Sequence, residues 1–97
     1  MKQNRMVALR RSLKLEVAPF ATLFGVSTST VYRWEQAGKA LRMDGAAAAI
    51  LLGYERAIME AGSRVKARLR EYAKQDGLEG IVRDGVLGLS KEESGGQ

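Results

Sequence analysis

Four polar side chains share one face of a helix predicted over residues 28–37. They are Ser29, Tyr32, Arg33 and Gln36. At 100° per residue this face lies opposite Val31 and Trp34, which the same geometry turns inward. Arginine can form two hydrogen bonds with guanine in the major groove of DNA and glutamine two with adenine, while hydroxyl groups can meet phosphates or base edges. The residue types and their spacing therefore predict a helix face able to read a DNA sequence.

Few side chains in this sequence are suited to other kinds of chemistry. It contains no cysteine and no histidine, which removes disulfides, thiolate nucleophiles, imidazole bases and the usual zinc ligands. Four carboxylates lie on predicted exposed helix faces, and no catalytic arrangement of partner groups accompanies them. They are Glu55, Glu60, Glu71 and Asp76. We therefore expect no enzyme activity, no metal ion and no cofactor.

Length and charge distribution restrict the interpretation further. With 97 residues and 45% hydrophobic content the chain has the size and composition of one small globular domain. Residues 1–42 hold eight basic and two acidic side chains, whereas residues 43–97 hold eight basic and nine acidic ones, so all of the net charge of +5 comes from the first part. Such asymmetry is typical of a polyanion-binding face. Because no apolar run is long enough to cross a membrane or to form a secretory signal, a cytoplasmic location is expected.

Helical spacing dominates the chain, so an all-α fold is predicted. Apolar side chains recur every three or four positions in each segment, for example in the stripe from Ala47 to Ile58. Ser27 and Asp44 are suited to be N-caps, and Gly25 to be a turn residue with positive φ. The predicted helices cover about residues 4–13, 17–24 and 28–37, then one after Asp44 and one from Ser63.

Residues 78–89 are ambiguous. Their apolar spacing suits a helix, but internal glycines oppose one, and Asp84-Gly85 is a two-residue hairpin signal. A short helix is the favoured of the two alternatives.

The segment from Met6 to Gly38 resembles the helix-turn-helix of the Cro/CI repressor family, also called XRE-like. In this family a first helix that ends in a basic stretch leads into a pattern of the form A-x-x-x-G-V-S-x-x-T-V-x-x-W-E-x-G. The matching positions are Ala21, Gly25, Val26, Ser27, Val31, Trp34 and Glu35, and Gly38 follows one position after the place of the last glycine in the pattern. The likeness covers about residues 5–60. One departure is that Glu16 and Val17 stand where family members carry a capping hydroxyl residue and a phosphate-binding glutamine.

The resemblance implies a lambda-repressor-like bundle of about five helices with a C-terminal helical extension. The chain is then expected to divide into a DNA-binding part over residues 1–62, a helical dimerisation extension over residues 63–90 and a disordered tail over residues 91–97. The extension is expected because the helix from Ser63 and the segment from Ile81 to Leu89 offer apolar surface. Arg10 and Glu35 hold the places of a structural ion pair between the first and third helices. Ala21, Gly25, Val31 and Trp34 would be structural as well. Predicted DNA contacts are Arg11, Lys14, Ser27, Thr28, Ser29, Tyr32, Arg33, Gln36, Lys39 and Arg42.

Members of this family usually bind palindromic operators as homodimers, so double-stranded DNA and a second copy of the chain are the expected partners. The expected role is a sequence-specific transcriptional regulator that acts as a repressor. Two alternatives stay open at this point. One is a winged helix-turn-helix of the MerR or excisionase type, since TVYRWEQAGKAL suits that class too; the other is a helical protein-interaction module without DNA.

Overall fold

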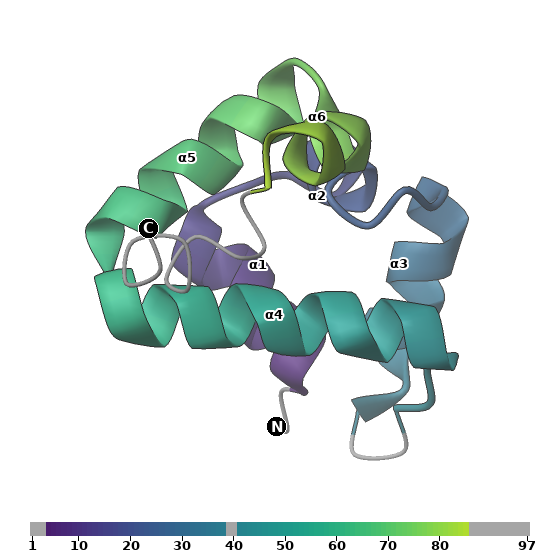
Figure 1. The fold of residues 1–97 in the computed structure, drawn as a ribbon. Helices are drawn as coiled ribbons and strands as arrows, with labels where there is room; N and C mark the ends of the chain where they lie inside the picture. The colour runs from purple at the N-terminus through teal and green to yellow at the C-terminus, as the bar shows by residue number, and fades with distance from the viewer. Residues whose placement is uncertain (1–3, 39–40, 86–97) are drawn as a thin grey trace.

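The computed structural model describes residues 4–38 and 41–85 of the chain, and these residues contain six helices and no strand (Figure 1). The all-α prediction is therefore confirmed. The helices are α1 (Arg5–Leu13), α2 (Val17–Thr22), α3 (Thr28–Gln36), α4 (Gly45–Ala61), α5 (Ser63–Lys74) and α6 (Gly77–Asp84). Even α4, the longest helix in the described ranges, does not reach the length of a bilayer-spanning segment.

Capping residues determine where several helices begin, as the sequence indicated. The side chains of Ser27 and Asp44 accept hydrogen bonds from the backbone N–H groups of Thr30 and Ala47, which satisfies an otherwise unpaired donor in each first turn. α2 has no such cap, because the side chain of Glu16, the residue before it, accepts no hydrogen bond from the first turn. The departure from the family pattern at Glu16 thus leaves this helix start without a side-chain acceptor.

Two predicted helix ends differ from the structure. α2 ends at Thr22 and not at Phe24, because the N–H groups of Leu23, Phe24 and Gly25 each bond to the carbonyl three residues earlier and tighten the chain into a turn. α3 ends at Gln36, one residue earlier than expected. Assigned helix ends usually vary by one or two residues, and both differences lie within that range.

One hydrophobic core joins all six helices. Phe24 lies near its centre, with its ring 5.2 Å from that of Phe20, 5.6 Å from Trp34 and 5.3 Å from Tyr54. The two contacts with Trp34 and Tyr54 are edge-to-face, which is a favourable arrangement for aromatic rings. The hydroxyl group of Tyr54 donates to the carbonyl of Leu23, so the buried phenol has a partner. This cluster fixes the turn after α2 to the middle of α4.

The segment beyond residue 62 belongs to the same core. Val65 and Leu69 of α5 and Ile81 of α6 are fully buried, and α5 contacts α1, α2 and α4, while α6 contacts α5 and α2. In Figure 1 α5 lies on the side of the molecule away from α3, and α6 lies over α2. The apolar face of α5, on which the prediction of a dimerisation surface relied, is therefore covered within the chain.

The ambiguous segment forms a helix over Gly77–Asp84. Gly85 ends it with φ 77° and donates its N–H to the carbonyl of Ile81 at 2.8 Å, so Asp84-Gly85 is a helix end and not a hairpin turn. Two glycines of this helix allow close packing. A Cβ on Gly77 would lie 2.7 Å from the carbonyl oxygen of Thr22, and one on Gly80 would lie closest to the side chain of Asp76 and 2.9 Å from the ring of Tyr72. The remaining predicted positions, 86–89 and the tail 91–97, lie outside the described residues.

Candidate nucleic-acid interface

α2, the turn after it and α3 form a helix-turn-helix. Gly25 has φ +67°, a conformation that is strained for other residues, and a Cβ there would lie 3.0 Å from Leu78 of α6. The N–H of Val26 then donates to the carbonyl of Ala21 at 3.2 Å, which directs the chain into α3. Ala21 is almost completely buried, as expected where two helices pack closely. The sequence predicted the positive φ of Gly25 but not its contact with α6.

α3 is held by its inward face. Val31 is fully buried and Trp34 is nearly so, as the helical wheel predicted. Ser27 caps the helix through a 3.2 Å bond from the N–H of Thr30, and its hydroxyl lies 3.1 Å from the hydroxyl of Thr30. The helix therefore has a defined start and a defined orientation in the molecule.

The outward face of α3 is exposed along its whole length. It carries Thr28, Ser29, Tyr32, Arg33 and Gln36, all classed as exposed. Tyr32 is 53% exposed, and the guanidinium of Arg33 makes one 3.3 Å bond to the hydroxyl of Thr30. In Figure 1 α3 lies at the edge of the molecule. The predicted base-reading side chains thus share one accessible surface that the rest of the described chain does not cover.

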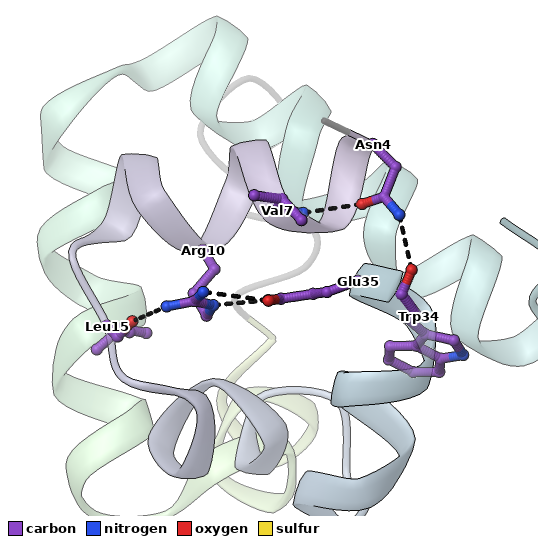
Figure 2. A network of polar contacts seen from close by, with 6 residues as sticks. All are labelled: Asn4, Val7, Arg10, Leu15, Trp34 and Glu35. Atoms are coloured by element: carbon purple, nitrogen blue, oxygen red, sulfur yellow. Dashed lines mark hydrogen bonds and ion pairs between the residues drawn. The ribbon is translucent and has the colours of Figure 1, made fainter. Parts of the chain in front are cut away.

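The predicted Arg10–Glu35 ion pair is present (Figure 2). Arg10 donates two hydrogen bonds to the Glu35 carboxylate, at 2.6 and 3.1 Å, and a third, of 3.1 Å, to the carbonyl of Leu15. The bond to Glu35 raises the pKa of Arg10 further above its usual value, with smaller contributions from the charges of Glu16 and Tyr32. Arg10 thereby connects α1, the α1–α2 linker and α3. It also neutralises the one carboxylate that α3 carries.

Asn4 is a second anchor of α3, and sequence reasoning missed it. Its Oδ1 accepts the N–H of Val7 at 3.0 Å and caps α1, while its Nδ2 donates to the carbonyl of Trp34 at 2.6 Å (Figure 2). That carbonyl lies in the last turn of α3, where it also accepts the N–H of Ala37 at 3.3 Å. The signal for the cap was present in the sequence, because asparagine is favoured at helix starts. The second bond spans 30 positions and has no local signal.

The predicted phosphate-contacting residues have different outcomes. Arg11 and Lys14 are exposed on α1 and at its end, and α1 packs against α3. Lys14 has φ 57° and ends α1 in a left-handed conformation. Arg42 is exposed shortly before α4, and Lys39 lies outside the described residues. Glu16, the acidic departure from the family pattern, is exposed at the start of α2 and close enough to Arg10 to affect its pKa.

Comparisons of the chain with protein-family models, with curated proteins and with solved structures gave no match. The functional interpretation therefore depends on the residues and their geometry. A winged helix-turn-helix needs a β-wing after its second motif helix. Residues 41–44 here are without regular structure and lead directly into the long helix α4.

Proposed function

We propose that this chain is a sequence-specific double-stranded DNA-binding transcriptional regulator that inserts α3 into the major groove. One observation carries the proposal: α3 exposes a continuous polar face with an arginine and a glutamine, while its other face is held in the core. A reading helix needs both properties, since its side chains must reach the base edges from a fixed backbone position.

The side chains on α3 have distinct proposed roles. Arg33 is suited to guanine, whose N7 and O6 accept its two-pronged donor set, and Gln36 is suited to adenine. Thr28 and Ser29 lie in the first turn, where backbone N–H groups and the helix dipole favour a phosphate. Tyr32 lies between them and Gln36 along the same exposed face, so its hydroxyl group could meet a phosphate or a base edge. Within the described residues, Arg33 is the one side chain of this set that makes a hydrogen bond to another part of the chain.

Basic residues around the helix-turn-helix would hold the sugar-phosphate backbone. Arg11 and Lys14 approach from α1, and Arg42, together with Lys39, from the segment between α3 and α4. Such contacts orient a protein on the duplex and supply affinity without reading sequence. Because Arg10 already neutralises Glu35, no unpaired carboxylate of α3 opposes this approach. By binding over a promoter in the cytoplasm, the protein would act as a repressor.

Selection of bound duplexes from a random pool tests the proposal directly. We expect enrichment of a short motif, and Arg33→Ala and Gln36→Ala should each weaken binding to that motif by about 10- to 100-fold, the range of one lost bidentate base contact. Arg56→Ala is the matched control for charge, since Arg56 is exposed on α4 outside the proposed interface. It should leave discrimination between the motif and random DNA unchanged.

The outcomes separate the proposal from the alternative of a protein-interaction module. DNA binding should weaken with added salt with a slope of about −0.9 for every phosphate contacted, because counterions are released. A pool without enrichment, combined with salt-independent retention, would refute DNA binding. Equal losses in the Arg33→Ala and Arg56→Ala proteins would refute the role of α3 while leaving non-specific binding in place.

A further inference from the structure

An open groove of about 360 Å³ runs between α1 and α4, on residues that the proposed DNA contact does not use. Its floor includes Leu9, its sides include Ser12 and Ile58, and Met59 lies at its rim. Arg5 and Glu55 bridge the two helices at the same place. The groove therefore combines an apolar floor with one positive and one negative side chain.

The surface of α4 at and beside this groove carries two exposed apolar side chains. Met59 is 82% exposed and Leu52, seven positions earlier on the same side of α4, is 42% exposed. Among the described residues only two other large apolar side chains are exposed, Tyr32 on the proposed DNA-contacting face and Val82 on α6. Two of the four thus lie in one stripe along α4, which is typical of a surface that another protein covers.

The charges of the groove favour a second copy of this chain over another partner. Arg5 donates two hydrogen bonds to Glu55, at 3.1 and 2.5 Å, and the pair is neutral in a chain of net charge +5. A guanidinium has five N–H donors and a carboxylate about four acceptor positions, so both groups keep capacity for a partner. In a dimer with a two-fold axis, residue i of the first copy contacts residue j of the second, and residue j of the first contacts residue i of the second. The cation of each copy can therefore meet the anion of the other, and the projecting side chain of each copy can enter the groove of the other.

We propose that the α1–α4 groove is the contact face between two copies of this chain, related by a two-fold axis, with Met59 of each copy seated in the groove of the other. This places the dimer contact on α1 and α4, whereas the sequence suggested the segment beyond residue 62, where the apolar face of α5 is buried. No residue of the groove belongs to α3. The inference is independent of DNA binding, and it is tested without DNA.

The first experiment measures mass over a dilution series by sedimentation equilibrium. The unaltered chain should approach twice 10.6 kDa at high concentration, and Met59→Glu should raise the dimer dissociation constant by at least about tenfold, because it places a charge in the desolvated centre of the contact. Val82→Glu is the matched control, since it adds the same carboxylate to an exposed apolar position on α6. It should dimerise like the unaltered chain.

A second experiment tests the groove through its charges. Arg5→Glu leaves two acidic groups there and Glu55→Arg leaves two basic ones, so each variant alone should dimerise more weakly. Mixing the two should restore the dimer as a heterodimer, detectable by native mass spectrometry, because opposite charges then meet across the axis. Both side chains are at least partly exposed, so folding should persist, as circular dichroism can verify.

Several outcomes would overturn the inference. These are a monomer at every concentration, a dimer that Met59→Glu leaves intact, a dimer lost through Val82→Glu alone, or a mixture of the charge variants that fails to form heterodimers. None of these results bears on whether α3 reads DNA, so failure of the dimer contact and failure of the proposed function remain distinguishable.

Discussion

Replacing Gly77 with alanine should destabilise this protein clearly more than the same change at Gly38. Both glycines have left-handed φ values, +62° and +57°, so alanine meets a similar backbone penalty at each. Their surroundings differ. A Cβ at Gly38 has no atom of the described residues within 4 Å, whereas one at Gly77 would lie 2.7 Å from the carbonyl oxygen of Thr22. The pair of variants therefore separates the cost of the backbone conformation from the cost of the contact between α6 and α2.

The magnitudes follow from these distances. A non-glycine residue in the left-handed region costs about 1–2 kcal/mol, partly offset because alanine restricts the unfolded chain, so Gly38→Ala should lose about 1 kcal/mol. At Gly77 an ordinary contact of 3.4 Å requires α6 to move away from α2 by 0.7 Å, the difference from 2.7 Å. Such overpacking costs about 1–3 kcal/mol. The total expected loss for Gly77→Ala is about 3 kcal/mol.

Urea unfolding followed by circular dichroism measures both values, and an unchanged m-value would show that the change is one of stability. If the two variants lost equal free energy, α6 would not be packed tightly against α2, and the reasoning would be refuted. The contact matters for function because the carbonyl of Thr22 also accepts the N–H of Gly25 at 3.3 Å within the turn that leads to α3. Gly77→Ala should therefore also weaken DNA binding beyond the fraction unfolded.

Three further predictions concern the polar anchors of the core. Arg10→Met should lose about 2 kcal/mol because it leaves Glu35 partly buried without its partner, and adding Glu35→Leu should recover part of that loss in a double-mutant cycle; strictly additive losses would contradict the pairing. Asn4→Ala removes a helix cap and a bond to α3 and should lose about 2 kcal/mol in urea unfolding, whereas Asn4→Asp, which keeps only the cap, should lose less. Burial raises the pKa of Tyr54, so the unfolded state releases this proton first and stability should fall as pH rises above about 10, by at most about 1.4 kcal/mol per pH unit. Tyr54→Phe should reduce that alkaline slope in pH-dependent unfolding, and an unchanged slope would show that the phenol does not contribute.

Local signals explain why most helices were predictable. α1, α3, α4 and α5 each have apolar side chains at helical spacing, and α3 and α4 also begin at a recognisable cap. Both signals depend only on residues within a few positions of one another. The ambiguity at α6 also has a physical cause. Glycine lowers helix propensity in any sequence, but at Gly77 and Gly80 the lack of a Cβ permits contact with Thr22 and Tyr72. The benefit comes from neighbours that the local sequence does not reveal.

The candidate site divides in the same way. The turn residue Gly25, the cap Ser27 and the two faces of α3 follow from the spacing in 25–38, and the Arg10–Glu35 pair was expected only through the resemblance to a family. The bonds from Asn4 to α3 and from Tyr54 to the turn had no counterpart in the sequence reasoning. Each joins residues about thirty positions apart. Such pairs form only when packing brings two helices together.

By itself, the sequence determined an all-helical chain, the turn before α3, and which side chains of α3 face outward, because the helical repeat and the capping preferences are properties of neighbouring residues. Only the tertiary structure decided which apolar stripes are covered. The stripe of α5 carries Val65 and Leu69 and is buried against other helices, whereas Leu52 and Met59 of α4 stay exposed. Both pairs fit a helical repeat, at four and seven positions apart, and their difference lies in which helices pack on them, since burial depends on contacts between distant segments.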